Sequence, residues 1–502
     1  MLYNSTENKN EVVSASRAIA QGISKDGGLF VPQELPHYDI ETLKELLPLG
    51  YKGIAKKVFT DYLSDFTAEE IEECVEKAYT ASKFGSDNPA PVSYKKFNGN
   101  DVSILELWHG PTCAFKDMAL QILPHLLTKS LKKTADGKDA VILVATSGDT
   151  GKAALEGFKD VDHTKIIVFY PVDGVSPMQK HQMNTQEGSN VKVCAIEGNF
   201  DDAQTGVKKI FTTSEIVEKL GQNNMMFSSA NSINWGRLLP QIVYYIAAYC
   251  ELVNDGKIEL GDKINVVVPT GNFGNILASY YAFCMGLPIN RFICASNSNN
   301  VLTDFIRTGV YDKNREFYTT ISPSMDILVS SNLERLLYKL SGDSDTMVRA
   351  WMNALKTDGR YEVTPEVKQA VSSAFYGGYC NEDLTKATIS KMYREENYLC
   401  DTHTAVAIAV YDNYVSETGD KTPALIASTA SPYKFSKAVL SSVESSDKLP
   451  ENEFDMVDML NDITKVEIPA PLASLKDKKT RFSDTVKVEE MPDYVLKALG
   501  IG

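Results

Sequence analysis

The stretch INVVVPTGNFGNILASYYAFCMG, residues 264–286, carries a strand signal, a loop and a helix signal in immediate succession. The β-branched run INVVVP (264–269) predicts a buried strand, and the apolar segment 275–286 predicts a helix that ends at Gly286. Between them lies the short loop TGNFGN, residues 270–275. This order is typical of α/β proteins, in which ligands bind where strands end and helices begin.

The same alternation recurs on both sides of this stretch. Helices are predicted over 151–160 and 201–220, and residues 300–420 are expected to be rich in helices, with a loop near Gly377 and Gly378. Continuous apolar strands separated by helices predict parallel sheets with flanking helices on both faces, so the fold class is α/β. Further strands are predicted at 140–147 (AVILVATS), 165–171 (KIIVFYP), 190–198 (NVKVCAIEG) and 423–429 (PALIAST).

Composition excludes several classes of partner. The formal net charge is −15, whereas nucleic acids and anionic membranes require a basic surface, so we expect neither as a partner. The eight cysteines form no C-x-x-C pair and the six histidines are scattered, so we expect reduced thiols and no metal site. The N-terminal stretch lacks the features of a secretory signal, and we expect a cytoplasmic protein.

The loop TGNFGN has the composition of an anion site. Gly271 and Gly274 allow the backbone to approach a ligand, and Asn272 and Asn275 supply side-chain donors. Backbone N–H groups at a helix start, with the helix dipole, suit a phosphate. The same residues are also typical of a purely structural turn from strand to helix.

Two more strand ends carry polar loops. In ATSGDTGKAA (145–154), backbone N–H groups and hydroxyls would suit a carboxylate, although a capped helix start is, for this loop alone, the more ordinary interpretation. In IASTASPYKF (426–435), hydroxyls could meet a ring nitrogen, and an N-cap before Pro432 is the alternative.

Lys116 lies in an apolar setting, HGPTCAFKDMALQ (109–121). A desolvated lysine has a lowered pKa and becomes a nucleophilic amine, the form that reacts to a Schiff base. A surface lysine whose stem packs along apolar neighbours is the alternative. A phosphate loop, a carboxylate loop and a buried lysine together indicate a pyridoxal phosphate enzyme that acts on an amino acid.

The order of these blocks resembles the threonine synthases of bacterial and fungal type, within fold type II (the β-family) of pyridoxal phosphate enzymes. Further blocks that carry the resemblance are AIAQGISKDGGLFVP (18–32), EGNFDDAQ (197–204) and NSINWGR (231–237). Near the end, members commonly read T-A-H-P-A-K-F, whereas this chain has TASPYKF, with Ser431 and Tyr433.

The resemblance implies roles for particular residues. Lys116 would be the catalytic lysine and would bind the pyridoxal 5'-phosphate covalently, and Thr429 would contact its pyridine nitrogen. Arg237, with Lys152 and Lys180 as further candidates, would meet the substrate phosphate. The cofactor phosphate would be held by Gly271, Asn272, Phe273, Gly274 and Asn275, and the substrate carboxylate by Ser147, Gly148, Asp149 and Thr150.

The resemblance also implies an activity, namely conversion of O-phosphohomoserine and water to L-threonine and phosphate. Two alternatives remain, another β-family lyase such as a threonine or serine dehydratase, and a catalytically silent sensor of a phosphate ligand. We expect a monomer or a homodimer.

The implied architecture is two domains that sandwich the cofactor, as in the tryptophan synthase β-like fold, plus an N-terminal domain that is mostly helical. The expected boundaries are 1–95 for the N-terminal domain, 96–135 with 200–450 for the large cofactor domain, 136–199 for the small domain with the substrate loop, and 451–502 for a C-terminal extension.

Overall fold

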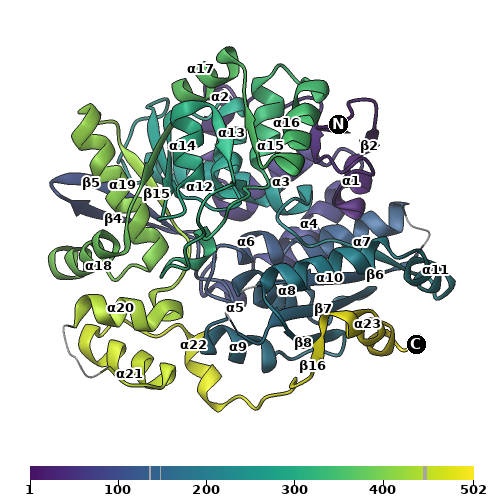
Figure 1. Ribbon diagram of the computed structural model, residues 1–502. Helices are drawn as coiled ribbons and strands as arrows, with labels where there is room; N and C mark the ends of the chain where they lie inside the picture. Colours follow the sequence, from purple (N-terminus) through teal and green to yellow (C-terminus); the bar gives the residue numbers. More distant parts are fainter. Residues whose placement is uncertain (135–136, 147, 174, 445–448, 502) are drawn as a thin grey trace.

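Two separate sheets organise the chain (Figure 1). The computed structural model describes residues 1–134, 137–146, 148–173, 175–444 and 449–501. Ser147, one of the residues expected to meet the substrate carboxylate, therefore lies outside the described residues.

The larger sheet has six strands in the order β14-β11-β10-β15-β5-β4. All neighbours pair in parallel except β4, which pairs antiparallel with β5 at the edge. The predicted strands at 264–269 and 423–429 are β10 and β15 of this sheet, at its centre. The strands are β4 (Val92–Phe97), β5 (Asn100–Glu106), β10 (Ile264–Pro269), β11 (Ile289–Ser296), β14 (Phe375–Tyr379) and β15 (Ala424–Ser428).

Alternate residues of this sheet enter two different cores. In β10, Val266 and Val268 belong to one cluster and Val267 to the other, as the two-residue period of a strand requires.

The loop expected near Gly377 and Gly378 is instead strand β14, so that prediction was wrong. A Cβ on Gly377 would lie 3.0 Å from the backbone of α14, and one on Gly378 would lie 2.6 Å from α19. The glycines therefore let helices approach both faces of β14.

The smaller sheet has five parallel strands in the order β16-β8-β7-β6-β9. The three predicted strands over 140–198 form its centre, and its outer strands come from outside residues 136–199. The strands are β6 (Asp139–Ala145), β7 (Thr164–Pro171), β8 (Val191–Glu197), β9 (Met225–Ser228) and β16 (Thr485–Lys487).

The N-terminal region is mostly helical, as expected, and also contains a small antiparallel sheet in the order β2-β1-β3. These strands of three or four residues give almost no alternating signal, which is why the sequence did not reveal them. The elements are β1 (Leu2–Ser5), β2 (Val12–Ser14), α1 (Ala15–Gln21), β3 (Phe30–Pro32), α2 (Ile40–Leu46), α3 (Gly50–Tyr62), α4 (Ala68–Ala78) and α5 (Ala81–Phe84).

The single helix predicted over residues 201–220 is two separate helices in the structure. Residues 201–220 fall into α10 (Phe200–Thr212) and α11 (Ser214–Gln222), because Thr213 is extended and its hydroxyl donates to the Lys209 carbonyl at 2.7 Å. Threonine has a weak helix propensity, and its side chain competes for backbone groups.

The remaining helices cover the two sheets or form the C-terminal segment. They are α6 (Asp117–Leu120), α7 (Leu123–Thr134), α8 (Asp149–Phe158), α9 (Pro177–Asn184), α12 (Trp235–Asn254), α13 (Gly274–Met285), α14 (Val301–Thr308), α15 (Leu333–Leu340), α16 (Asp345–Thr357), α17 (Pro365–Ala374), α18 (Glu382–Glu396), α19 (Thr402–Thr418), α20 (Ser436–Val443), α21 (Glu453–Thr464), α22 (Ala470–Ala473) and α23 (Met491–Leu499), with short 3-10 turns η1 (Pro323–Met325), η2 (Pro432–Phe435), η3 (Ser474–Asp477) and η4 (Val488–Glu490) and a two-stranded ribbon of β12 (Val310–Asp312) and β13 (Arg360–Glu362).

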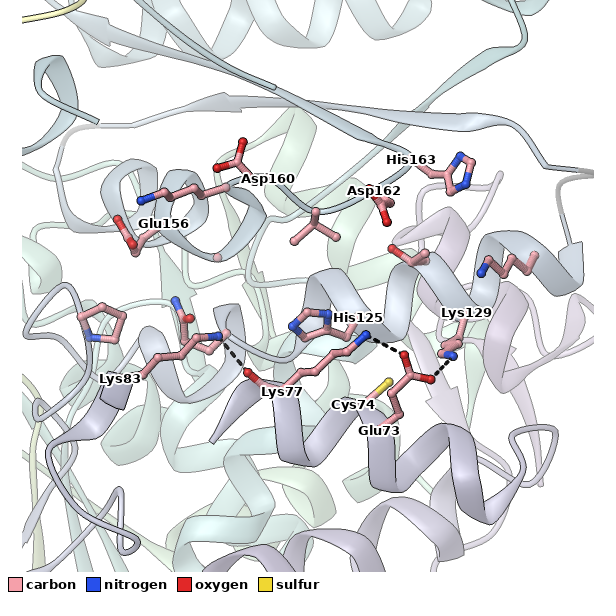
Figure 2. Close-up of a pocket in the computed structure, with 17 residues that line it drawn as sticks. Glu73, Cys74, Lys77, Lys83, His125, Lys129, Glu156, Asp160, Asp162 and His163 are labelled. Carbon is pink, nitrogen blue, oxygen red and sulfur yellow. Dashed lines mark hydrogen bonds and ion pairs between the residues drawn. The ribbon is translucent and has the colours of Figure 1, made fainter. Parts of the chain in front are cut away.

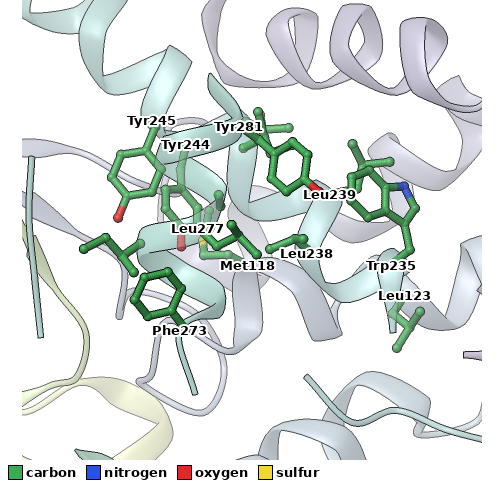
Figure 3. Packing of buried hydrophobic residues seen from close by; sticks show 14 of the residues in the cluster. Met118, Leu123, Trp235, Leu238, Leu239, Tyr244, Tyr245, Phe273, Leu277 and Tyr281 are labelled. Carbon is green, nitrogen blue, oxygen red and sulfur yellow. The ribbon is translucent and has the colours of Figure 1, made fainter. Parts of the chain in front are cut away.

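The largest apolar core joins both sheets through α12. Figure 3 shows Met118 of α6 beside Leu238 and Leu239 of α12, with Leu277 of α13 and Phe273, which precedes that helix, packed in the same cluster. The helices that follow Lys116 and the glycine loop thus share one rigid backing. Within the part of the chain that the structure describes, no helix is long and apolar enough to cross a membrane.

Candidate active site

Lys116 immediately precedes α6, and its side chain is only 11% exposed. The loop before it is held by Asp117, whose carboxylate accepts the backbone N–H of Thr112 at 2.8 Å and its hydroxyl at 2.7 Å. Burial lowers the pKa of Lys116 to about 8; the nearby Asp149 raises it, and the charges of Lys434 and Arg237 lower it further. A substantial fraction of this amine is neutral near pH 8, as a nucleophile or base requires.

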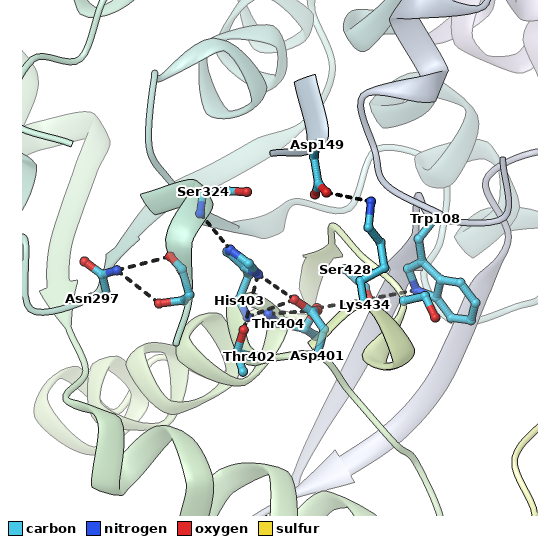
Figure 4. Close-up of polar contacts among 12 residues, drawn as sticks. Trp108, Asp149, Asn297, Ser324, Asp401, Thr402, His403, Thr404, Ser428 and Lys434 are labelled. Atoms are coloured by element: carbon cyan, nitrogen blue, oxygen red, sulfur yellow. Dashed lines mark hydrogen bonds and ion pairs between the residues drawn. The ribbon is translucent and has the colours of Figure 1, made fainter. Parts of the chain in front are cut away.

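Asp149, the first residue of α8, is part of a buried ion pair (Figure 4). Its carboxylate lies 2.6 Å from the amine of Lys434 and 3.9 Å from that of Lys116. It also accepts a hydrogen bond from the Gln179 side chain at 2.9 Å. Burial raises the pKa of Asp149, but the two lysines and the Gln179 hydrogen bond more than offset that effect and hold it well below its usual range. Asp149 is therefore an anion facing Lys116.

Lys434 was not singled out from the sequence. Its side chain is fully buried and its amine also donates to the Thr112 carbonyl at 2.9 Å, in the same loop that leads to Lys116. The only sequence signal was its place in TASPYKF, two residues after Pro432. Since the pairing with Asp149 joins distant segments, no local pattern could show it.

The glycine loop, predicted to bind an anion, leads directly into the start of α13. Phe273 takes a positive φ of 64°, which turns the chain into the helix, and no acidic residue lies in the first turn. A Cβ on Gly274 would find its nearest atoms, the side-chain nitrogens of Asn332 and Gln241, at 3.5 and 3.7 Å. Both nitrogens already donate to backbone carbonyls, that of Asn332 to Ser232 and Asn272 and that of Gln241 to Arg237.

Close packing explains the other glycine of this loop. A Cβ on Gly271 would lie 2.4 Å from the carbonyl of Ser324, so only glycine fits there. The Gly271 carbonyl accepts the Ser330 hydroxyl at 2.7 Å, and that of Asn272 accepts the backbone N–H of Asn332 at 3.1 Å.

Asn275 and Arg237 each retain an unused donor. Asn275 accepts the hydroxyl of Tyr244 at 2.8 Å and that of Tyr245, while its buried Nδ2 has no hydrogen-bond partner within the described ranges. Arg237 donates to the Ala230 carbonyl at 3.0 Å, and its buried Nε also lacks a partner among the residues that the structure describes. Burial lowers the pKa of Arg237 to about 10.

The third loop lies directly against the Lys116 loop. The Phe115 N–H donates to the Thr429 carbonyl at 2.8 Å, and the Ser431 N–H donates to the Cys113 carbonyl at 3.1 Å. Ser431 caps the following turn through the Tyr433 N–H, and the Tyr433 hydroxyl donates to the Val466 carbonyl. Of the two residues that depart from the family pattern, Tyr433 therefore ties this loop to the C-terminal segment, and Ser431 ties it to the Lys116 loop and caps the turn.

A buried histidine lies on the other side of the glycine loop. The ring of His403 contacts Asp401 through Nδ1 at 2.7 Å and accepts the Ser324 N–H through Nε2 at 3.1 Å (Figure 4). Since Ser324 packs onto Gly271, this histidine supports the loop from behind. Sequence reasoning missed it, because a single histidine in DTHT carries no signal beyond an Asp N-cap.

The remaining predicted residues differ in their surroundings. Gly148 precedes α8, and a Cβ there would lie 2.6 Å from the Gln179 side chain; Thr150 is partly buried in the first turn. Lys152 pairs with Glu156 at 3.0 Å and also donates to Gln186. These two partners use two of the three N–H groups of the Lys152 amine. Lys180 is partly exposed on α9.

Residues 88–429 match the family model described as pyridoxal-phosphate dependent enzyme. That match covers most of the chain and includes Lys116, the loops before α8 and α13, and Thr429. It defines the class of the protein as a pyridoxal-phosphate-dependent enzyme.

Two further matches and the relatives narrow the class. Residues 2–79 match the threonine synthase N terminus and residues 404–495 the threonine synthase C-terminal model. The threonine synthase of Saccharomyces cerevisiae is 34% identical over 525 residues, covering 99% of this chain and 98% of that protein. Human threonine synthase-like 1 is 40% identical over 439 residues, and the match covers 86% of this chain but only 58% of the human protein's length.

Solved structures agree. The crystal structure of the yeast threonine synthase has a TM-score of 0.88 at 32% identity, and that of the PLP-bound threonine synthase from Brucella melitensis has 0.87 at 35%; each comparison covers 99% of both chains. The chain belongs to the threonine synthase family.

The residues present fit pyridoxal phosphate. The amine of Lys116 is buried with a lowered pKa, and the start of α13 offers N–H groups with space in front of Gly274. The unused Nδ2 of Asn275 supplies a further donor in the first turn of that helix. A buried amine and a donor-rich helix start are the two features that an aldehyde-bearing phosphate ester requires.

Proposed function

We propose that the protein is a lyase that converts O-phosphohomoserine and water to L-threonine and phosphate. The observation that carries the proposal is the buried amine of Lys116, which has a pKa of about 8 and lies 3.9 Å from the anionic Asp149. Membership in the threonine synthase family supports this choice of reaction.

The loop 271–275 would hold the cofactor phosphate through the N–H groups at the start of α13. Thr429 would face the pyridine nitrogen and Lys116 would bind the cofactor covalently. When bound, pyridoxal phosphate supplies an electron sink for the substrate carbon atoms next to the amino group. A neutral hydroxyl partner does not stabilise a ring cation, so Thr429 would leave the ring nitrogen largely unprotonated.

Lys116 would move protons at the substrate Cα and Cβ. Its amine must be neutral to accept a proton, and burial together with the charges of Lys434 and Arg237 favours that form. Asp149 would stabilise the ammonium once it has formed, because the carboxylate lies within reach of both lysines. Over the whole reaction, phosphate leaves from Cγ and water adds at Cβ.

The loop of Ser147, Gly148, Asp149 and Thr150 at the start of α8 would receive the substrate carboxylate; among its backbone N–H groups, that of Gly148 already donates to the Thr146 hydroxyl at 3.0 Å. The Asp149 side chain cannot do so, since it is itself an anion, and its pairing with Lys434 reduces the repulsion of a second carboxylate. Arg237 is the candidate for the substrate phosphate, because its buried Nε has no partner among the described residues.

The test is to assay the cofactor-loaded protein with O-phosphohomoserine, measuring threonine and inorganic phosphate, and with threonine, measuring ammonia. Equal release of threonine and phosphate, without comparable ammonia release, supports the proposal. Ammonia release from threonine without phosphate release would instead identify a dehydratase.

Borohydride reduction followed by peptide mapping tests the third candidate, a silent sensor. Label on Lys116 together with turnover excludes a sensor, whereas label without turnover of either substrate supports it. The domain boundaries at 95, 135, 199 and 450, a cytoplasmic location and a monomeric or homodimeric state also remain predictions.

A further inference from the structure

A second pocket lies outside the candidate active site (Figure 2). It has a volume of about 600 Å³, and its walls come from α4, α7, the end of α8 and residues 159–163. None of the residues expected to bind cofactor or substrate lines it. Its size is in the range of small-molecule sites.

Most carboxylates of this pocket already have partners. Glu73 lies between Lys77, at 2.6 Å, and Lys129, and these two lysines lower its pKa to about 2. Asp160 accepts the N–H of Ser189 at 2.8 Å and its hydroxyl at 2.9 Å. Two cations therefore neutralise the charge of Glu73, whereas Asp160 is held by neutral donors and a further carboxylate, Asp162, also lines the pocket.

The carboxylate of Glu156, which also lines the pocket, has partners as well. It pairs with Lys152 at 3.0 Å and accepts the side-chain amide of Gln186 at 3.0 Å. These bonds attach it to the wall formed by α8 and α9.

Three residues that line the same pocket carry hydrogen-bond donors with fewer acceptors than N–H groups. The amine of Lys83 donates to the Lys77 carbonyl at 2.9 Å, and within the described part of the chain no carboxylate lies within 4.0 Å of it. An ammonium has three N–H groups, so two remain for another partner. Burial lowers the pKa of Lys83, which is the cost of keeping this charge away from water and from a counter-ion.

Gln121 and His125 supply the other donors. Gln121 is 2% exposed, and its buried Nε2 has no hydrogen-bond partner among the residues described. Burial lowers the pKa of His125 to about 4, so the ring is neutral and one ring nitrogen carries a proton. Of the three donors, only the Nε2 of Gln121 is fully buried without a partner among the described residues; such donors are rare in proteins and are satisfied by a bound group or an ordered water.

We propose that this pocket binds a small anion, a carboxylate or phosphate group, through Lys83, Gln121 and His125. The anion accepts the free N–H groups of Lys83 and the unmatched Nε2 of Gln121, and the neutral histidine adds a third donor. The site is separate from the one proposed for pyridoxal phosphate and extends beyond the proposed reaction.

The position of the pocket connects it to the candidate active site. Gln121 is the residue at which α6 ends, five positions after Lys116, and its N–H donates to the Asp117 carbonyl at 3.0 Å. On the opposite wall, a Cβ on Gly157 of α8 would lie 2.0 Å from the Leu120 carbonyl. The pocket thus borders the contact between the two helices that begin at Lys116 and Asp149.

The experiment is isothermal titration of the cofactor-loaded protein, without substrate, with malonate in one series and inorganic phosphate in another. The variants are Lys83→Gln, Lys83→Arg, Gln121→Glu and, as a matched control on the exposed rim, Lys132→Gln. A hydrogen bond to a charged group contributes about 1.5–3 kcal/mol, so Lys83→Gln is expected to weaken binding at least about tenfold. Gln121→Glu places a negative charge at the donor and is expected to act in the same direction.

Binding by Lys83→Arg and Lys132→Gln is expected to stay within about threefold of the parent, because both keep the charge at position 83. The probe that responds to Lys83→Gln identifies whether the carboxylate or the phosphate is preferred. If neither probe binds the parent, or if binding persists unchanged in both Lys83→Gln and Gln121→Glu, the proposal is wrong. The second result would assign the anion to the active site.

Discussion

Two helices begin at the carboxyl ends of central strands, one in each large sheet, and they differ in charge. Helix α13 follows β10 and has no acidic residue in its first turn, whereas α8 follows β6 and begins with Asp149. A helix N-terminus favours a negative charge in both cases. At α13 the first turn supplies no such charge, while at α8 the chain supplies it through Asp149, which pairs with Lys434 at 2.6 Å.

The difference shows that the same strand-loop-helix geometry can serve two purposes. The start of α13 is the proposed phosphate site and has Asn332 and Gln241 nearby. The start of α8 is part of the electrostatic setting of Lys116, since Asp149 and Lys434 act on the lysine in opposite directions. An anion near the start of α8 would therefore lie close to the Asp149–Lys434 pair, whereas an anion near the start of α13 would lie close to backbone N–H groups and no acidic side chain of the first turn.

The largest effect on turnover is expected from removing the amine of Lys116, which lies near the Asp149–Lys434 pair. Lys116→Ala should lower turnover of O-phosphohomoserine by at least about 10³-fold, because the residue would act as nucleophile and base. The control is Lys192→Ala, an exposed lysine of β8, which should stay within about threefold. Turnover of Lys116→Ala within tenfold of the parent contradicts the role of this lysine.

Breaking the charge pair at α8 should have the next largest effect. Lys434→Met leaves Asp149 buried without its nearest partner, and the loss of unfolding free energy is expected to be about 3–5 kcal/mol, measured by urea denaturation. The pKa of Lys116 should rise, since Lys434 lowers it, and turnover at pH 7 should fall.

The double variant Lys434→Met/Asp149→Asn provides the control for this pair. It removes both charges, and its stability should exceed that of Lys434→Met alone. Strictly additive losses in the two single variants and the double variant would show that the pair is not coupled.

The open site at α13 can be probed with two alanines. Gly274→Ala places a methyl group at ordinary contact distance, 3.5 Å from Asn332, in front of the helix N-terminus. It should weaken pyridoxal phosphate binding by about tenfold, the effect of impairing one hydrogen bond to a charged group, with little change in the melting temperature of the apoprotein.

The comparison variant is Gly271→Ala, whose Cβ would lie 2.4 Å from the Ser324 carbonyl, so the apoprotein itself should melt at a lower temperature. Cofactor affinity is measured by absorbance titration. If Gly274→Ala lowers the melting temperature and leaves the affinity unchanged, the loop is a structural turn only.

The smallest effect concerns pH. The pKa of Lys116 is lowered from about 10.4 in an unfolded chain to about 8. Between these values the unfolded state binds more protons than the folded apoprotein, so unfolding free energy should rise with pH, by up to about 1.4 kcal/mol per unit. Below pH 8 both states are protonated and this contribution is constant.

Urea denaturation of the apoprotein at pH 7.5 to 9.5 measures the slope. Other groups titrate in the same interval, so the relevant quantity is the difference between the parent and Lys116→Ala. The variant should show the smaller slope. Identical slopes would mean that the amine of Lys116 titrates normally in the folded state.

The sequence was informative where local pattern and final structure coincide. β10, β6, β7, β8 and β15 were predicted within one or two residues, because buried parallel strands are continuous apolar runs. The short strands β1–β3, the glycine-containing β14 and the edge strand β16 were not, since their pairing is set by tertiary contacts.

The candidate site divides in the same way. Lys116 and the loop 270–275 have local signatures, an amine in an apolar segment and a glycine-rich helix start. The Asp149–Lys434 pair and the contact of His403 with Ser324 join segments far apart in the sequence. Such contacts have no local signature, and only the folded chain reveals them.

The smaller sheet has a consequence for synthesis on the ribosome. Its outer strand β16 and the covering helix α23 come from residues 485–499, while its other four strands end at Ser228. Met491 and Val495 belong to the core on that face, and α23 packs so closely on α10 that a Cβ at Gly206 would meet the Met491 sulfur at 2.4 Å. At a translation rate of roughly 5–20 residues per second, β16 is synthesised on the order of tens of seconds after β9. During that interval the edge of β8 and the apolar surface that Met491 and Val495 later cover are accessible to chaperones or to another nascent chain.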